Sequence, residues 1–294
     1  MNKHTLLDSY PVNLASLFFW KSKLFRHNLD SPTYEELFDS ISFEWPEIKG
    51  EGTYEVPTQT AVGKLDPAFR IARWNGSDHP TIIYHHGNNE RPFDNRSFAK
   101  NTFRDIFLAK NANVPANLIV VRAPHHRSFR GYLKQMGSLA TFTAVLSVSA
   151  MIIEKLTRYA KESSNRVALS GISLGGWVTN LHRAYFNTAD VYIPLLAGTA
   201  PGDVFTHSIY RKLTAPLARK NPEKVEGILD FGTKFAEVKD KNVFPLLARY
   251  DQLIRFEKQK ASYGKEHPVA VIDKGHVTGS LAVDELRRHI TAHL

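Results

Sequence analysis

The chain has 294 residues, of which 43% are hydrophobic and 23% charged, which is typical of a folded globular protein and unlike a disordered or fibrous chain. It contains no cysteine, which excludes disulfides, thiolate metal sites, cysteine nucleophiles and iron–sulfur clusters. The formal net charge of +9 is compatible with nucleic acid, anionic lipid or an acidic substrate, and charge alone does not choose among them.

Residues 1–48 are rich in aromatic residues and leucine, and we expect them to form a helical extension before the main domain. A helix start is indicated at Ser31-Pro32, because serine caps a first turn well and proline fits inside it. Glu35 and Glu36 then place negative charge near the positive end of the helix dipole.

The apolar stretch at residues 14–25 is interrupted by Lys21 and Lys23, and no apolar run in the chain reaches the ~18 residues of a membrane span. Asp8 and Pro11 precede the stretch, so it does not resemble a secretory signal, and cytoplasm is the expected location. Its alternation of apolar and basic residues predicts a surface helix. Such a stripe usually packs on its parent domain, and peripheral contact with a membrane is the alternative.

Residues 49–294 predict one α/β domain. Two strand-like runs, 53–62 and 68–74, suggest an antiparallel hairpin at its start. Short apolar strands then alternate with helices, which predicts a buried, mostly parallel central sheet of about eight strands flanked by helices. The strands are expected at 81–85, 118–121, 167–169, 191–196, 243–248 and 269–272, and the helices at 98–110, 137–161, 256–263 and 281–293.

A long connection separates two of these predicted strands. The segment from about 199 to 241 is mostly helical and basic, and it exceeds the usual length of a strand-to-helix connection. We therefore expect a helical cap insertion over the edge of the sheet.

The sharpest local motif is Gly171-Ile172-Ser173-Leu174-Gly175-Gly176, which directly follows a predicted strand and precedes a predicted helix. This is the pattern G-x-S-x-G in the setting that it needs. A tight turn from strand to helix lifts the serine hydroxyl above the sheet, and glycines flank it because the backbone is crowded there. The alternative is a glycine-rich helix entry in which the serine is only a cap.

A serine hydroxyl is a weak nucleophile, so a catalytic role for Ser173 requires a base and an acid that orients the base. Asp251 ends one predicted strand and Asp203 follows another, so both are candidate acids. His276, in the loop after the last predicted strand, is the candidate base. Either aspartate is alternatively a helix cap.

Four places give the chain a resemblance to the α/β-hydrolase superfamily over residues 53–294: His86-Gly87, the Ser173 turn, Asp251 and Gly275-His276. In that superfamily the order along the chain is serine, acid, histidine. The resemblance implies that Ser173 is the nucleophile, His276 the base and Asp251 the orienting acid, with Asp203 as the alternative acid. It also implies that no cofactor is required.

The same resemblance implies an oxyanion hole built from two backbone amides, those of Asn88 and Leu174. The segment His86-Gly87-Asn88-Asn89 carries a single glycine and lacks the HGGG stretch of some lipases and esterases. Asn89 is therefore the alternative donor to Asn88.

The loop after the second parallel strand borders the pocket in this superfamily. The predicted pocket-lining residues are His86, Gly87, His125, His126 and Arg127. We predict no metal site at the two adjacent histidines, because no carboxylate or third ligand follows at a recognisable spacing. Arg127, Arg130 and the basic segment 211–224 suggest a pocket that accepts acidic groups such as a phospholipid head, and a solvated basic surface is the alternative.

The resemblance implies a serine hydrolase that cleaves a carboxylic ester through an acyl-enzyme. Serine at the turn argues against the dehalogenase and epoxide hydrolase branches and leaves amidase, thioesterase and peptidase chemistry open. Together with Asp203-Val204-Phe205-Thr206-His207-Ser208, the turn is similar to a poorly characterised branch associated with lipid ester cleavage.

The expected partner is therefore a small ester substrate, acidic or lipid-like. A competing hypothesis is a non-catalytic protein that binds a small ligand on the same fold. Specific nucleic-acid binding is not predicted, since no helix-turn-helix, RNP-like or zinc-finger pattern occurs. The sequence does not indicate an oligomeric state.

Overall fold

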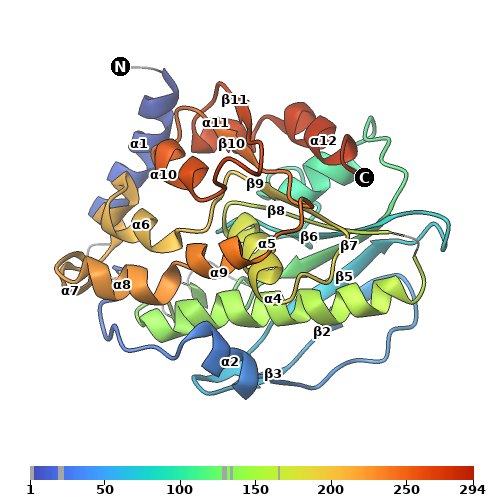
Figure 1. The fold of residues 1–294 in the computed structure, drawn as a ribbon, viewed down its shortest axis with the longest axis horizontal. Helices are drawn as coiled ribbons and strands as arrows, with labels where there is room; N and C mark the ends of the chain where they lie inside the picture. The colour runs from blue at the N-terminus through green and yellow to red at the C-terminus, as the bar shows by residue number, and fades with distance from the viewer. Residues whose placement is uncertain (1–2, 19–22, 128–130, 133–134, 165) are drawn as a thin grey trace.

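The computed structural model describes residues 3–18, 23–127, 131–132, 135–164 and 166–294. In this part of the chain, eight strands form one sheet in the order β11-β10-β9-β8-β6-β7-β5-β2 (Figure 1). The strands are β2 (Gly52–Glu55), β5 (Ala68–Arg73), β6 (Thr81–His85), β7 (Asn117–Arg122), β8 (Val167–Ile172), β9 (Val191–Leu195), β10 (Leu246–Ala248) and β11 (Ala270–Ile272). The predicted mostly parallel sheet of about eight strands is confirmed.

The six strands from β11 to β7 run parallel, and β5 and β2 complete one edge in antiparallel fashion. Strands β6, β7, β8 and β9 are buried along their whole length, as expected for strands covered on both faces. In the ladder, His85 pairs with Gly171 and Gly171 with Pro194. The carboxyl ends of these strands therefore lie side by side at the same end of the sheet, and the loops that follow them meet there.

Helices cover both faces of the sheet (Figure 1). Helices α4 (Leu139–Lys161) and α5 (Leu174–Tyr185) pack on one face, and α12 (Val283–Thr291) packs with η1 (Arg104–Leu108) on the other. Among the described residues, α4 is the one helix long and apolar enough to cross a membrane, but most of it is buried inside the molecule. Its apolar length therefore serves the core. The helix expected at 98–110 is reduced to the short segment η1.

The N-terminal extension forms α1 (Lys3–Phe18) and α2 (Tyr34–Ser40). The cap of α2 is Thr33 rather than Ser31. Its hydroxyl accepts a hydrogen bond from the Glu36 amide at 3.3 Å, and the Glu36 carboxylate accepts one from the Thr33 amide at 2.9 Å. This reciprocal pair satisfies two amides at once, so the helix begins later than the serine predicts.

The predicted opening hairpin differs from the observed pairing. The run 53–62 breaks at Pro57, and its second part becomes β3 (Thr58–Thr60), which joins β1 (Ser42–Phe43) and β4 (Gly63–Leu65) in a separate small sheet. Of the run 53–62, only β2 pairs with β5. Proline cannot donate a ladder hydrogen bond, which explains why one continuous strand does not form.

The segment after α1 packs into the main domain. Leu24 and Phe25 are buried, and the Phe25 ring makes edge contacts with the rings of Phe142 on α4 and Phe205. This part of the predicted amphipathic stripe thus packs on its parent domain. Lys21, in the middle of the stripe, lies outside the described residues.

The segment expected as a cap forms short helices between β9 and β10. They are α6 (Pro201–Thr206), η2 (Ile209–Leu213), α7 (Pro216–Arg219), α8 (Pro222–Leu229) and α9 (Gly232–Glu237). Three of them begin at a proline in the first turn, where its missing amide costs nothing. Helix α1 packs against η2 of this cap and against α11 (His276–Ser280), which follows β11.

Candidate active site

Ser173 occupies the turn between β8 and α5 in a strained backbone conformation, with φ 55° and ψ −111°. Such a conformation costs about 1–3 kcal/mol and persists only where its surroundings enforce it. The Ser173 amide donates to the carbonyl of Leu195 at 2.8 Å, and its carbonyl accepts from the amide of Trp177 at 3.0 Å. Strand β9 and helix α5 thus hold the turn so that the hydroxyl projects beyond the sheet.

The glycines of the motif meet a steric requirement. A Cβ at Gly171 would overlap the backbone carbonyl of Gly175, and a Cβ at Gly176 would lie 2.6 Å from the Cβ of Ala197. The helix therefore approaches the sheet more closely than any side chain permits. This explains why the motif needs small residues on both sides of Ser173.

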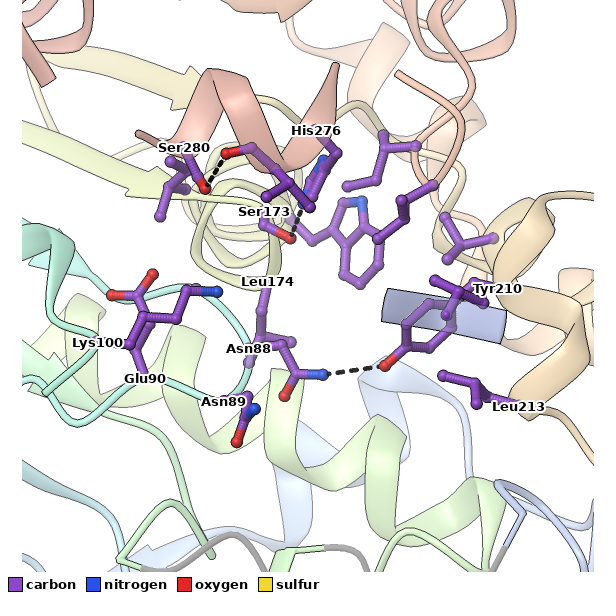
Figure 2. Close-up of a pocket in the computed structure, with 18 of the residues that line it drawn as sticks. Asn88, Asn89, Glu90, Lys100, Ser173, Leu174, Tyr210, Leu213, His276 and Ser280 are labelled. Atoms are coloured by element: carbon purple, nitrogen blue, oxygen red, sulfur yellow. Dashed lines mark hydrogen bonds between the residues drawn. The ribbon is translucent and has the colours of Figure 1, made fainter. Parts of the chain in front are cut away.

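His276 connects Ser173 to Asp251. Its Nε2 lies 3.0 Å from the Ser173 hydroxyl oxygen (Figure 2), and its Nδ1 lies 2.7 Å from Oδ2 of Asp251. The other carboxylate oxygen of Asp251 accepts hydrogen bonds from the amides of Leu253 at 2.9 Å and Ile254 at 2.7 Å. The acid is thus fixed by its own loop, and it in turn orients the imidazole with Nε2 toward the serine.

The electrostatics of His276 suit a base. Burial lowers its pKa, but the charge and hydrogen bond of Asp251, with the charge of Asp8, outweigh burial, so the pKa is raised above its usual value. The charge of Lys100 acts in the opposite direction. A nearby carboxylate favours imidazolium, the form that arises when histidine takes a proton from serine.

Asp203, the alternative acid, is engaged elsewhere. It lies on α6, is buried, and pairs with the guanidinium of Arg255, whose Nε is 3.0 Å from Oδ2. The hydrogen bonds of the structure therefore bring Asp251, and not Asp203, to His276.

The predicted oxyanion-hole residues lie beside the nucleophile. Asn88 and Leu174 line the same pocket as Ser173, and Asn89 lines it as well (Figure 2). The side-chain amide of Asn88 lies 3.4 Å from the hydroxyl of Tyr210 and 3.2 Å from Nε2 of His126. The cap and the loop after β7 thus fix the Asn88 side chain from two sides.

Of the five predicted pocket-lining residues, the described part of the chain brings Gly87 to the pocket and places the other four elsewhere. His86 is fully buried: its Nδ1 donates to the Gly87 carbonyl at 2.6 Å, and its Nε2 accepts from the Ala123 amide at 3.0 Å. His126 packs against its ring. These rings hold the loops after β6 and β7 together. The superfamily resemblance does not separate this structural role from a role in lining the pocket.

Burial also decides the charge of these histidines. It lowers the pKa of His126 to about 4 and that of His86 well below the usual value, so both are neutral near pH 7.

His125 is also held by a structural contact, since its backbone amide donates to the Asp66 carboxylate at 2.7 Å. Among the described residues, no group of three histidine, aspartate or glutamate side chains is arranged to hold a metal ion.

None of the described basic residues that were expected to receive acidic groups lines this pocket. Arg127 pairs with Glu55 and Asp66 and borders a separate, open cavity of about 500 Å³. In the cap, Lys212 donates to Asn13 at 2.6 Å and Lys224 pairs with Asp30 at 2.5 Å. Arg130 lies outside the described residues.

The pocket at Ser173 has a volume of about 520 Å³ and a mainly apolar lining. Helix α5 contributes Leu174 and Trp177, whereas Phe205 and Leu213 come from the cap. The apolar lining residues are Val12, Leu24, Phe142, Ile172, Leu174, Trp177, Val204, Phe205, Leu213, Leu253, Ile254, Val277 and Leu281. Glu90 and Lys100 lie together at one side (Figure 2).

Sequence reasoning missed most of this lining. Val12 and Leu24 come from the N-terminal extension, and Phe142 comes from the long helix α4. Apolar residues on helices carry no local mark that separates a pocket wall from a core contact. Their role follows only from the way in which the extension and the cap fold over the edge of the sheet.

No protein-family model and no curated protein matches the sequence. Solved structures do resemble it. Acetyl xylan esterase 1 from Thermoanaerobacterium sp. JW/SL YS485 is 13% identical with a TM-score of 0.54, covering 94% of this chain and 93% of that protein. The acetyl xylan esterase from Paenibacillus sp. R4 is 14% identical with a TM-score of 0.54, covering 100% and 95%.

A second kind of neighbour is the acylaminoacyl peptidase of Pyrococcus horikoshii, which is 16% identical with a TM-score of 0.56. The match covers 82% of this chain but 41% of the peptidase, so the chain spans about two fifths of that protein. Together these likenesses show that the chain has the α/β-hydrolase fold, as predicted, and that its structural neighbours are esterases and peptidases.

Proposed function

We propose that this protein is a serine hydrolase that cleaves carboxylic esters with an apolar acyl group through an acyl-enzyme intermediate. One observation carries the proposal. Ser173, on a strained turn at an apolar pocket, lies 3.0 Å from the imidazole of His276, which is held 2.7 Å from the buried carboxylate of Asp251. This is the arrangement that activates a serine hydroxyl for acyl transfer.

In the first half of the reaction, the Ser173 oxygen attacks the ester carbonyl carbon while its proton passes to Nε2 of His276. The carbonyl electron pair moves onto oxygen, where the amides of Leu174 and Asn88 would stabilise the charge; each such donor contributes ~3 kcal/mol in serine hydrolases. The intermediate then collapses, the bond to the leaving oxygen breaks, and the imidazolium returns the proton to the departing alcohol.

In the second half, a water molecule attacks the acyl-enzyme carbonyl and transfers a proton to His276. The bond to the Ser173 oxygen breaks as His276 gives that proton back to the serine. The products are a carboxylic acid and the free enzyme, so atoms and charges balance without a cofactor.

The lining of the pocket indicates the kind of acyl group. Burial of apolar surface contributes about 25 cal/mol per Å², so an alkyl or aryl chain gains binding energy against Trp177, Phe205 and Phe142. The volume of about 520 Å³ is in the range of small-molecule sites. These features favour an acyl chain longer than acetyl. They do not favour an acidic group or a sugar in this pocket.

The test is hydrolysis of p-nitrophenyl esters from acetate to decanoate, compared with a p-nitroanilide of the best acyl group. We expect ester turnover that rises with chain length to an optimum and vanishes in Ser173→Ala. Faster cleavage of the anilide than of the ester would favour amidase or peptidase chemistry instead. Absence of turnover in a folded protein would favour the non-catalytic ligand-binding alternative.

Membrane contact through the apolar and basic stripe at residues 14–25 stays a prediction, and helix α1 adds an exposed apolar surface in its N-terminal half, outside that stripe. The helix exposes Leu6, Leu7 and Tyr10, with 47%, 49% and 70% of their surface accessible, while its opposite side packs on the domain. Vesicle flotation of the wild type and of a variant with glutamine at these three positions checks it. Equal flotation of the two proteins would contradict membrane contact through these three side chains.

A further inference from the structure

Asp8, on helix α1, is a carboxylate buried beside the active site. It is fully inaccessible to solvent. One of its oxygens accepts hydrogen bonds from the amides of Gln252 at 3.2 Å and His276 at 2.8 Å, and the other accepts from the amide of Val277 at 2.9 Å. The N-terminal extension thus reaches two loops that lie more than 240 residues further along the chain.

These three amides belong to the catalytic machinery or adjoin it. Gln252 directly follows the orienting acid, Asp251, and His276 is the base itself. A single carboxylate therefore ties the loop that carries the acid to the loop that carries the base. Their separation determines the 2.7 Å contact between the two side chains.

Gly275 leaves space for the Asp8 carboxylate and has no side chain that could cap helix α11 in its place. A Cβ at Gly275 would lie 2.7 Å from Oδ2 of Asp8, so glycine is needed for the carboxylate to enter. Gly275 is also the residue before helix α11, and it has no side chain to cap the first-turn amides. Asp8 accepts from two of those amides and places negative charge at the positive end of the helix.

A second contact from α1 supports the same region. His4, one turn before Asp8, lies with Nδ1 2.9 Å from the hydroxyl of Thr278, which itself accepts from the Gly275 amide at 2.9 Å. The His4 ring also stacks on Tyr250, next to Asp251. Helix α1 therefore contacts both loops at more than one point.

We propose that Asp8 is a positioning residue of the catalytic triad: it fixes the acid loop and the base loop in one geometry and adds negative charge beside the imidazole of His276. The proposal rests on the proposed function for its kinetic consequences. The charges that act on His276 are those of Asp251 and Asp8, which raise its pKa, and that of Lys100, which lowers it. Asp8 thus also favours the imidazolium formed during each acyl transfer.

The experiment compares Asp8→Asn and Asp8→Ala with the wild type and with Asp30→Asn. Asp30→Asn removes a carboxylate from the same N-terminal extension, where Asp30 is exposed and pairs with Lys224. Three quantities are measured: kcat and KM with a p-nitrophenyl ester, the rate of fluorophosphonate labelling against pH, and the pKa of His276 by NMR titration of its imidazole.

We expect Asp8→Ala to lose about ten- to a hundredfold in kcat with little change in KM, because the triad is displaced while the pocket persists. In Asp8→Asn the side chain keeps its size but loses its charge, so the pKa of His276 falls and the acid limb of the labelling profile moves to lower pH. Asp30→Asn should match the wild type in all three measurements.

Unchanged kcat, labelling profile and His276 pKa in folded Asp8 variants would overturn the proposal. If Asp8→Ala does not fold, Asp8→Asn decides through the titration. Failure of the proposed function is distinguishable, because labelling and the His276 pKa require no ester turnover. A wild type that cleaves no ester, with a His276 pKa that falls in Asp8→Asn, would refute the esterase proposal and retain the positioning role.

Discussion

Gly175 lies so close to His85 that a Cβ on the glycine would overlap the His85 carbonyl oxygen. Helix α5 therefore packs backbone to backbone against the end of β6, directly beneath the nucleophile. The neighbouring residues of β6 lead into the loop that carries Asn88. This contact places the Ser173 turn, which carries Leu174, next to the loop that carries Asn88.

Gly175→Ala should destabilise the fold by about 3 kcal/mol or more, because the atom that the methyl group meets belongs to the backbone and cannot turn away. Gly227→Ala is the matched control, since a Cβ at this exposed position of α8 meets nothing within 4 Å. It should stabilise the protein by about 0.5–1 kcal/mol, as alanine is the better helix former. Urea denaturation measures both; equal effects of the two substitutions would contradict the packing described.

Asp251→Asn should reduce kcat by about 10⁴, because an amide cannot hold the imidazole in the orientation and charge state that the reaction needs. Asp203→Asn should leave kcat within a few-fold of the wild type, since Asp203 pairs with Arg255 away from His276. Steady-state kinetics of the two purified variants decide. Reversed losses would show that the acid is assigned to the wrong residue.

Activity should fall with decreasing pH at a higher pH than for an ordinary histidine. His276 must be neutral to accept the Ser173 proton, and its pKa is raised above the usual value by Asp251 and Asp8 despite burial. The acid limb of the pH profile of kcat/KM reports this pKa in the free enzyme. A midpoint below the normal range of histidine would be inconsistent with the carboxylates acting as described.

Leu213→Trp should shift acyl-chain preference toward short chains, because Leu213 lines the pocket from the cap and a larger ring occupies part of the cavity. We expect KM for octanoate to rise about tenfold while acetate turnover stays close to wild type. Leu217→Trp, on exposed α7 outside the pocket lining, is the control. The same dependence on acyl-chain length in the wild type, Leu213→Trp and Leu217→Trp would mean that the acyl group does not bind next to Leu213.

The sheet and the Ser173 turn were predictable because each leaves a local mark. Buried parallel strands read as short apolar runs, and the turn needs glycines at fixed spacing. His276 and Asp251 were proposed from their places after strands, and the structure sets them within hydrogen-bond distance of each other. The details that differed, such as the cap of α2 at Thr33, depend on which of two neighbouring hydroxyls meets a free amide.

Asp8 shows what local reasoning cannot reach. Its partners lie 244 and 269 residues away, so no spacing in the sequence connects them. The histidines of the loops after β6 and β7 illustrate the opposite error. Their place in loops that border the pocket in the α/β-hydrolase superfamily suggests a pocket lining, yet His86 makes a structural contact with the Ala123 amide. Only the packing of the loops separates these two roles.

The most direct measurement is intact-mass spectrometry after incubation with a fluorophosphonate, for the wild type and for Ser173→Ala. We expect one covalent adduct on the wild type and none on the variant, because only a serine activated by His276 reacts readily. An equal adduct on Ser173→Ala, or no adduct on a folded wild type, would contradict the assignment of Ser173 as the nucleophile.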